Sequence, residues 1–201
     1  MSELEKLNQE IRDCRRCELY QSRASAVPGE GPEDAEILFV GEAPGWHEDR
    51  QGRPFVGAAG KYLEELLASI NLTREQVYIT NVLKSRPPNN RDPRPEEIEA
   101  CKPFLERQIA LIKPRLVVTL GRFSLMHFLA NAKISKVHGQ PRRVRDFLCH
   151  PMYHPAAALH QPKYRQAIEE DMRRIPQMLA KAKELMDEEV PDENHEQLSL
   201  F

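Results

Sequence analysis

The chain has 201 residues, of which 40% are hydrophobic and 30% are charged, and this is enough for one ordinary domain with its own apolar core. No stretch approaches the roughly 20 apolar residues of a membrane-spanning helix. The first residues, MSELEKLNQEIRD, are a charged helix start without the apolar region of a secretion signal. These features argue against a membrane or secreted protein, and we expect a cytoplasmic monomer.

The formal net charge of −2 conceals an acidic C-terminal segment. Residues 187–201 hold six Asp and Glu but no Lys or Arg, which leaves 29 basic and 25 acidic residues, a charge of +4, in residues 1–186. We expect residues 1–186 to form the folded domain and residues 187–201 to be a flexible acidic tail. The charge of +4 favours a polyanionic partner only weakly, because lysines scattered over a solvated surface give the same total.

Apolar runs of strand length alternate with segments of helical period along the chain. In chain order we predict a strand at Ile37–Gly41, a helix at Ala58–Ile70, a strand at Val77–Asn81, a helix at Pro95–Ile112, a strand at Leu116–Gly121, a helix at Phe123–Ala130 and a strand at Phe147–His154. This alternation indicates an α/β fold with a parallel sheet covered on both faces. Ligands bind such sheets at the carboxyl ends of the strands.

The loops that follow the strand ends carry most of the candidates for chemistry. Glu42 lies in the stiff turn GEAPG, where a carboxylate can orient water or stabilise a cation. A turn carboxylate that caps a following amide is an equally good alternative. His154 precedes Pro155 at a predicted helix start, and by itself a capping or packing histidine is the commoner case.

Asn81 and Phe55 are candidates for binding a nucleic acid base. The amide of Asn81 offers a donor and an acceptor for the edge of a base, although Asn is also common in turns. Phe55 could stack on a base, although a single aromatic residue after a loop usually belongs to the core. Lys84 and Arg86 flank the same strand end, where they could contact phosphates or lie on a solvated surface.

The cysteines are too few and too unevenly spaced for a disulfide scaffold; they are Cys14, Cys17, Cys101 and Cys149. Cys14 and Cys17 form a CxxC pair, which in a reducing compartment favours a metal site or redox chemistry. Cys149 lies on a predicted strand, where a buried apolar cysteine is the commoner case. The chain has no GxxxxGK phosphate loop, which disfavours a nucleotide-binding enzyme on a similar sheet.

Several motifs together resemble the family 4 uracil-DNA glycosylases, the iron–sulfur type found in bacteria and archaea, and we expect the bacterial form. The motifs lie within residues 8–180, in family order: GEAPG, EDRQGRPFVGAAG, TNVLK followed after Ser85 by RPPNNRDPRPEEIEAC, then LGRFS, KVHG and YHPAAAL. The resemblance implies a three-layer αβα sandwich around a central four-stranded parallel sheet. It also implies a DNA-repair enzyme that flips deoxyuridine out of single- or double-stranded DNA and hydrolyses the bond between uracil and sugar.

The resemblance assigns roles to individual residues. Glu42 would assist the attacking water or the cationic sugar, and His154 would hydrogen-bond uracil O2 as charge develops there. Asn81 would bind N3–H and O4, with a neighbouring group that fixes its amide. Phe55 would stack on the base, and Glu48 would lie near C5, where a thymine methyl group would collide. The set implied to bind uracil is Gly41, Glu48, Phe55, Asn81 and His154.

The resemblance also implies DNA contacts by Lys84, Arg86, Leu159, Lys163 and Arg165. Leu159 is the expected wedge between bases. No lysine in the motifs stands as a Schiff-base nucleophile, so we expect hydrolysis to an abasic site without strand cleavage. The alternative is a uracil- or damage-binding protein of the same fold, with activity weakened by an altered iron–sulfur site; the presence of Glu42, Asn81 and His154 together favours the enzyme.

In the family, four cysteines hold a 4Fe-4S cluster, and Cys14, Cys17 and Cys101 match three of them, whereas Ser85 stands at the position of the fourth. A serine hydroxyl is harder to deprotonate than a thiol and binds iron less well. Three outcomes are open: the Ser85 oxygen is a ligand, a 3Fe-4S cluster forms, or the cluster is labile and absent. Zinc held by three cysteines is a further alternative. We expect a structural rather than a redox role.

The chain ends in QLSLF, Gln197–Phe201, which resembles the short peptide by which bacterial repair and replication proteins bind the sliding clamp. Leu198, Leu200 and Phe201 are apolar anchors after an acidic segment. We expect this motif to bind the clamp and so to raise the local concentration of the enzyme on DNA. A terminal helix cap or a fold-back onto the domain is the alternative.

Overall fold

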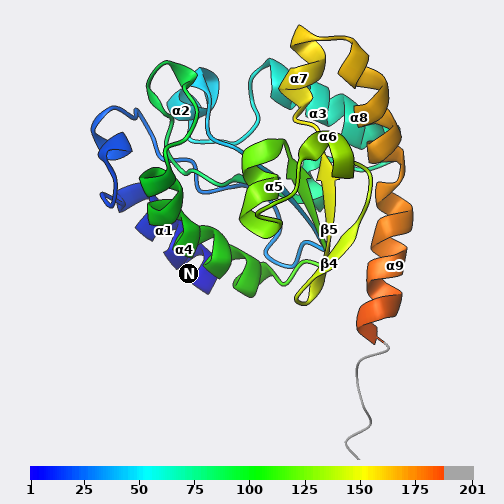
Figure 1. Ribbon diagram of the computed structural model, residues 1–201. Helices are drawn as coiled ribbons and strands as arrows, with labels where there is room; N and C mark the ends of the chain where they lie inside the picture. The colour runs from blue at the N-terminus through cyan, green and yellow to red at the C-terminus, as the bar shows by residue number, and fades with distance from the viewer. Residues whose placement is uncertain (188–201) are drawn as a thin grey trace, which may run out of the picture.

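A computed structural model describes residues 1–187 and places a mixed sheet at the centre of the chain (Figure 1). The strands are β1 (Ile37–Gly41), β2 (Tyr78–Asn81), β3 (Leu116–Leu120), β4 (Arg142–Val144) and β5 (Phe147–Met152). They lie in the order β2-β1-β3-β5-β4. All neighbours pair in parallel except β4, which is antiparallel to β5. The predicted α/β class is confirmed, but the predicted four-stranded, purely parallel sheet is wrong, because a hairpin adds β4 at one edge.

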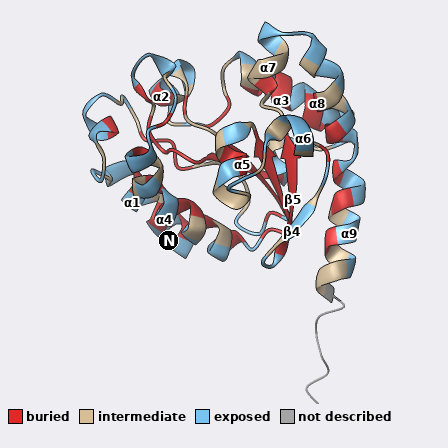
Figure 2. Cartoon of the chain, viewed as in Figure 1, coloured by how far each residue is buried: buried red, intermediate tan, exposed pale blue. Residues whose placement is uncertain are grey.

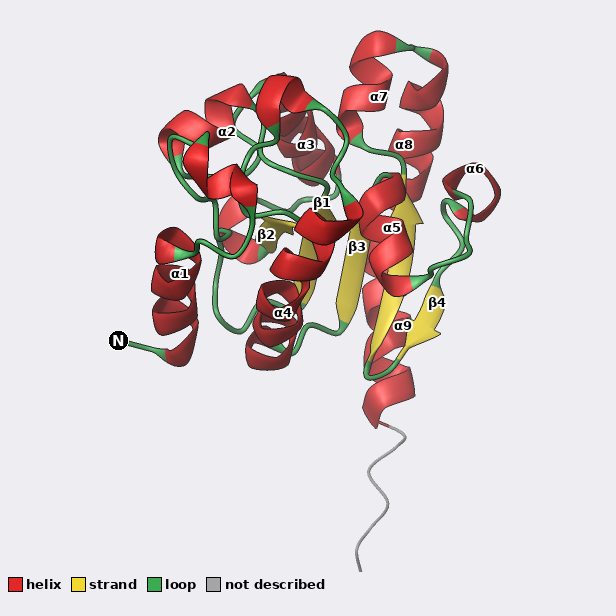
Figure 3. Cartoon of the chain, turned by 60° about the vertical axis from the view of Figure 1, so that its left-hand side comes forward, coloured by secondary structure: helices red, strands yellow, loops and turns green. Residues whose placement is uncertain are grey.

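Helices flank the sheet and connect its strands (Figure 3). Their bounds are α1 (Glu3–Asp13), α2 (Trp46–Gln51), α3 (Ala58–Ser69), α4 (Pro95–Ile112), α5 (Arg122–Phe128), α6 (Ile134–Val137), α7 (Pro155–His160), α8 (Lys163–Arg173) and α9 (Ile175–Asp187). The predicted helices at 58–70, 95–112 and 123–130 are therefore confirmed to within two residues at each end.

Alternate residues of the buried strands face different helical layers. Phe39 of β1 packs in one core with Leu63 of α3 and with side chains of α8 and α9. Leu38, its neighbour, packs in a second core with Leu7 of α1 and side chains of α4. Because side chains alternate across a strand, a strand without polar residues must be covered on both faces. Figure 2 shows the resulting arrangement, with buried strands and exposed outer helix surfaces.

Two helices begin where the sequence provides a cap. Ser2 Oγ accepts a hydrogen bond from Glu5 N at 3.1 Å, and the Glu5 carboxylate accepts one from Ser2 N at 2.7 Å, which starts α1. Helix α4 starts with Pro95 in its first turn. Cys14 is the C-cap of α1 and α4 contains Cys101, so these two helices carry cysteines toward the loop after β2.

The loops after β1 and β2 are hydrogen-bonded to each other beyond the sheet. Val82 N donates to Gly41 O at 3.0 Å, and Leu83 N donates to Glu42 O at 3.0 Å. These bonds continue the strand pairing past its last pair, Gly41 with Asn81. The backbone therefore fixes Glu42 beside Asn81 at the carboxyl edge of the sheet.

The expected acidic tail lies outside the described residues, apart from Asp187 at the end of α9. The same holds for the motif at Gln197–Phe201, so both stay predictions. Among residues 1–187, no helix has the length and apolar character needed to cross a membrane.

Candidate active site

A pocket of about 380 Å³ opens at the carboxyl ends of the strands. Its lining residues are Glu42, Ala43, Pro44, Gly45, Glu48, Phe55, Ala59, Asn81, Pro87, Asn90, Arg91, His154 and Ala156. The predicted residues among them come from the segment after β1, the last residue of β2 and the loop after β5. The structure therefore brings together side chains that are more than 100 positions apart in the sequence.

Phe55 has a strained backbone conformation beside this pocket. Its φ of 51° lies in the left-handed region, which costs a residue with a side chain roughly 1–2 kcal/mol. Its ring centroid lies 5.5 Å from that of His154, at an interplanar angle of 23°. Helix α3 passes so close that a Cβ at Gly60 would lie 1.8 Å from Phe55 O. Only glycine fits at position 60, and the resulting contact fixes the Phe55 carbonyl.

Gly41 leaves room for the two side chains that are predicted to hold the base. A Cβ at Gly41 would lie 2.3 Å from Asn81 Oδ1 and 2.7 Å from Cε2 and Cζ of Phe55. Such contacts are far inside van der Waals distance. A glycine is therefore required at position 41, because any larger side chain would collide with Asn81 and Phe55.

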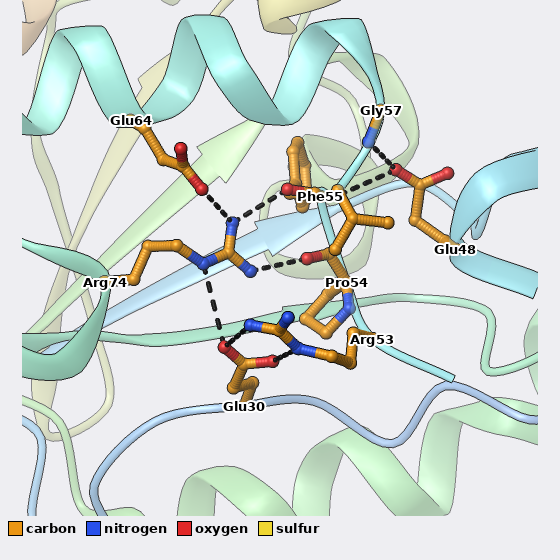
Figure 4. Close-up of polar contacts among 9 residues, drawn as sticks. Glu30, Glu48, Arg53, Pro54, Phe55, Gly57, Glu64 and Arg74 are labelled. Carbon is orange, nitrogen blue, oxygen red and sulfur yellow. Dashed lines mark hydrogen bonds and ion pairs between the residues drawn. The ribbon is translucent and has the colours of Figure 1, made fainter. Parts of the chain in front are cut away.

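Glu48 fixes the backbone just beyond Phe55. Its Oε1 accepts hydrogen bonds from Val56 N and Gly57 N, both at 2.9 Å (Figure 4). The neighbouring Asp49 is buried and accepts a hydrogen bond from Ala24 N at 3.0 Å, which anchors helix α2. One carboxylate oxygen of Glu48 is thus used by the loop itself, and its predicted place near C5 of the base stays a prediction.

The carboxyl group of Glu42 is half-buried and has an unusual pKa. This pKa is raised from 4.5 to about 7, mainly by burial and in addition by the negative charge of Asp92, while the positive charge of Arg122 opposes the shift. Asp92 and Arg122 form an ion pair with each other. A carboxyl group that titrates near neutral pH is suited to proton transfer and to stabilising a developing positive charge.

His154 caps helix α7 with its side chain. Nδ1 accepts a hydrogen bond from Ala156 N at 3.1 Å. Burial lowers the pKa of His154 to about 4, so the imidazole is neutral at physiological pH. Because Nδ1 acts as an acceptor, the single ring proton resides on Nε2, which makes Nε2–H the donor available to a ligand.

Asn81 is 2% exposed and lies at the end of β2. Within residues 1–187 its side-chain amide makes no hydrogen bond, so the predicted neighbouring group that fixes the amide is absent there. The amide is confined by packing instead, because Asn81 Oδ1 lies directly above the backbone of Gly41. Its donor and acceptor are left for a ligand.

The prediction that Lys84 contacts DNA is wrong. The side chain is buried, at 2% exposure, and burial lowers its pKa to about 7. Nζ donates to three acceptors, Thr80 Oγ1 at 2.6 Å, Asn81 O at 2.7 Å and Gln108 Oε1 at 2.7 Å. All of its donors are satisfied inside the protein, so Lys84 connects the end of β2 to α4 and cannot reach a phosphate.

The other residues predicted to contact DNA are accessible. Leu159 on α7 is 49% exposed, and Lys163 and Arg165 are exposed on α8. Arg165 Nε donates to a Glu169 oxygen at 2.9 Å, and Arg86 is half-buried. Figure 2 shows exposed surface along α7 and α8. Their contacts with DNA stay predictions.

Three thiols lie near one another beside the loop after β2. Cys17 and Cys101 pack against Leu19 in one small apolar cluster, and Cys14, the C-cap of α1, acts electrostatically on both of these thiols. Burial raises the pKa of the Cys17 thiol and that of Cys101, the latter to about 11. The backbone N–H of Lys84 hydrogen-bonds the Cys101 thiol, which lowers that pKa in part.

The fourth expected ligand position differs from the other three. Ser85 is buried, and its Oγ accepts a hydrogen bond from Arg23 Nη1 at 2.9 Å, while Arg23 Nη2 donates to Cys14 O at 2.9 Å. In the part of the chain that the structure describes, no three His, Cys, Asp or Glu side chains could together hold a metal ion. A cluster held by four thiolates does not fit this set, which offers three thiols and one serine hydroxyl that is hydrogen-bonded to a guanidinium.

Three charged residues that act on this pocket were not predicted from the sequence. Asp92 and Arg122 influence the pKa of Glu42, and both lie inside motifs that carried the resemblance, RDP and LGRFS. Arg74 lies in the short segment between α3 and β2 and binds the backbone carbonyls of Pro54 and Phe55, which belong to the loop of residues 54–57, called the Phe55 loop below. The sequence holds no signal for this role.

The pocket combines an aromatic ring, an amide, a neutral imidazole and a carboxyl group, which is the composition of an enzyme site suited to a planar base. The family described as "Uracil DNA glycosylase superfamily" matches residues 28–174. The chain is 49% identical to the type-4 uracil-DNA glycosylase of Sulfurisphaera tokodaii over 188 residues. These residues make up 89% of this chain and 86% of that protein.

A second relative is the type-4 uracil-DNA glycosylase of Archaeoglobus fulgidus, 49% identical over 191 residues, which are 90% of this chain and 96% of that protein. The protein of that name from Thermotoga maritima is 42% identical over 186 residues, which are 89% of this chain and 95% of that protein. This chain belongs to the uracil DNA glycosylase superfamily, among its type-4 members. The expected bacterial form stays a prediction.

Proposed function

We propose that this chain is a uracil-DNA glycosylase, an enzyme that removes uracil from DNA. The observation that carries the proposal is the convergence of Glu42, Phe55, Asn81 and His154 on one pocket in a chain of this family. A ring for stacking, an amide for the base edge and two groups with shifted pKa values are what excision of a base requires.

Uracil would be recognised by its edge and its face. The Asn81 amide would donate to O4 and accept from N3–H, whereas cytosine carries an amino group and an unprotonated N3 at these positions. Both hydrogen bonds would therefore be mismatched with cytosine. Phe55 would stack on the ring above Gly41, and the loop held by Glu48 would exclude the methyl group of thymine.

The chemical step would be hydrolysis of the bond between uracil N1 and C1′ of the sugar. As this bond breaks, its electron pair passes to the uracil ring, and His154 Nε2–H would stabilise the charge at O2. The Glu42 carboxylate would stabilise the cationic sugar and orient a water molecule. The water oxygen would bond to C1′, its proton would pass to Glu42, and uracil would take up a proton from solvent.

The DNA would lie across the surface formed by α7 and the start of α8. Leu159 would occupy the space left by the flipped nucleotide, and Arg86, Lys163 and Arg165 would contact phosphates. These residues lie around the pocket mouth or on the helices that follow His154. Both single- and double-stranded DNA are proposed as substrates.

The products test this function. Incubation with an oligonucleotide that contains one deoxyuridine should yield free uracil and an intact strand with one abasic site, as measured by mass spectrometry before and after alkaline cleavage. A thymine oligonucleotide is the control. Binding of the uracil strand without release would instead support the damage-binding alternative, and an adduct trapped by borohydride would contradict simple hydrolysis.

The type-4 proteins typically hold a 4Fe-4S cluster, and we propose that Ser85 weakens such a cluster in this chain. The substitution Ser85→Cys is expected to raise the iron and acid-labile sulfide bound per chain, because it supplies a fourth thiolate in place of the hydroxyl bonded to Arg23. Elemental analysis after anaerobic purification measures this. Ser85→Ala is the control and should bind no more iron than the wild type; equal iron in wild type and Ser85→Cys would refute the proposal.

The motif at Gln197–Phe201 is proposed to bind a bacterial sliding clamp, in keeping with its apolar anchors. It is tested by comparing the affinity of a purified clamp for the full chain and for a chain that lacks residues 197–201. Equal affinities would exclude the motif as the binding segment.

A further inference from the structure

We infer that Arg74 is a positioning residue for uracil excision, which holds Phe55 in the conformation that stacks on the base. The nature of the stacked ligand rests on the proposed function. The positioning itself rests on contacts around residues 54–57, which are drawn in Figure 4.

The guanidinium of Arg74 binds two successive carbonyl groups of the Phe55 loop. Nη1 donates to Phe55 O at 2.7 Å, and Nη2 donates to Pro54 O at 2.6 Å. The side chain is 9% exposed, so these charge-assisted bonds are largely shielded from water. Arg74 also contacts Glu64 at 3.3 Å. The planar guanidinium of one side chain thus fixes the directions of two consecutive carbonyl groups. It thereby fixes the backbone conformation at Phe55.

The opposite groups of the same loop are held by Glu48, whose Oε1 accepts from Val56 N and Gly57 N. A cation therefore holds the carbonyls of residues 54 and 55, and an anion holds the N–H groups of residues 56 and 57. Between these two clamps Phe55 adopts its φ of 51°. A strained conformation of this kind persists only where the surroundings impose it, and such strain is found at functional sites.

Glu30 connects this arrangement to the sheet. It also binds Arg53, whose substitution serves as a matched control for that of Arg74. The backbone of Glu30 pairs with Ile79 of β2, through N–H···O bonds of 2.9 and 2.8 Å. Its carboxylate lies 3.7 Å from Arg74 Nε and binds Arg53 through two hydrogen bonds of 2.7 Å. Arg53 is exposed, and its guanidinium donates to Glu30 alone within residues 1–187. Arg53 and Arg74 therefore both contact the Glu30 carboxylate, but only Arg74 also binds the backbone carbonyls of the loop.

The experiment compares Arg74→Met, Arg74→Lys and Arg53→Met with the wild type. Arg74→Met should lower kcat/KM for uracil excision by about 10- to 100-fold, because misplacing the bound base by about 1 Å costs up to about 100-fold. Arg74→Lys should recover part of this loss, because an ammonium can reach one carbonyl but not hold both. Arg53→Met should stay within about threefold of the wild type, since surface ion pairs contribute little.

Two further measurements separate positioning from a general structural role. Affinity for DNA with a tetrahydrofuran abasic analogue, which has no base to stack, should be nearly the same in Arg74→Met and the wild type. Amide hydrogen exchange at Val56 and Gly57 should accelerate in Arg74→Met and not in Arg53→Met. The exchange result is independent of catalysis, so it judges Arg74 even if the wild type releases no uracil, which would refute the proposed function alone.

Equal losses in Arg74→Met and Arg53→Met would overturn the inference. So would a loss of affinity for abasic DNA as large as the loss of excision, or unchanged exchange at Val56 and Gly57.

Discussion

Gly41→Ala is expected to lower uracil excision by at least about 100-fold while the chain still folds. The new methyl group would lie 2.3 Å from Asn81 Oδ1 and 2.7 Å from two ring carbons of Phe55. Both are side-chain atoms, so they can move away, but the amide and the ring are the groups proposed to bind uracil. Single-turnover excision of uracil, together with thermal unfolding, measures the effect.

The control for this substitution adds the same methyl group at Gly57, where it would lie 3.3 Å from the nearest atom, Glu48 Oε1. Because this contact is only slightly short and involves the end of a flexible side chain, Gly57→Ala should lose less than about tenfold. If Gly41→Ala keeps near wild-type activity, then Asn81 and Phe55 do not hold the base in the manner proposed.

Glu42→Gln is expected to reduce kcat by about 100- to 10,000-fold, the contribution typical of a general acid or base. In the wild type, kcat/KM should rise as the pH is raised through about 7 and then level off, because the pKa of Glu42 in the unliganded protein is about 7 and the carboxylate is the active form. His154 adds no titration in this range, since its pKa is about 4. The pH dependence of kcat/KM should therefore be nearly flat near pH 7 in Glu42→Gln.

The same substitution should stabilise the protein at high pH. The pKa of Glu42 is raised in the folded state, so the folded chain binds more protons than the unfolded chain between 4.5 and about 7. Stability contributed by this group is therefore lost as the pH rises through that range. The melting temperature of Glu42→Gln minus that of the wild type should be larger at about pH 8 than at about pH 5. A wild-type rate without an inflection near pH 7 would contradict the assigned role of Glu42.

The strands and the long helix are predictable because their own residues determine them. The apolar run at β1 and the proline that starts α4 are local signals, and both elements have the predicted bounds. Strand β4 gives no such signal, because it has three residues, RRV, which are mostly exposed. Its formation depends on pairing with β5, with Arg145 in a left-handed turn between them. Propensity along the chain does not reveal such an edge strand.

The pocket residues are predictable from motifs, whereas the residues that support them depend on tertiary contacts. A lysine is normally exposed, and only the acceptors Thr80, Asn81 and Gln108 make the burial of Lys84 possible. Arg74 acts on a carbonyl 19 positions away, so its role cannot be recognised from its neighbours in the sequence. The role of a side chain that binds backbone far away in the sequence can be recognised only from the three-dimensional structure.

The most direct test of the account compares the rates at which the wild type and Asn81→Ala release uracil, thymine and cytosine from otherwise identical oligonucleotides. The wild type is expected to release uracil alone, and Asn81→Ala is expected to lose most of this activity. Release of cytosine or thymine by the wild type at rates near that of uracil, or full uracil release by Asn81→Ala, would contradict recognition of the base by this pocket.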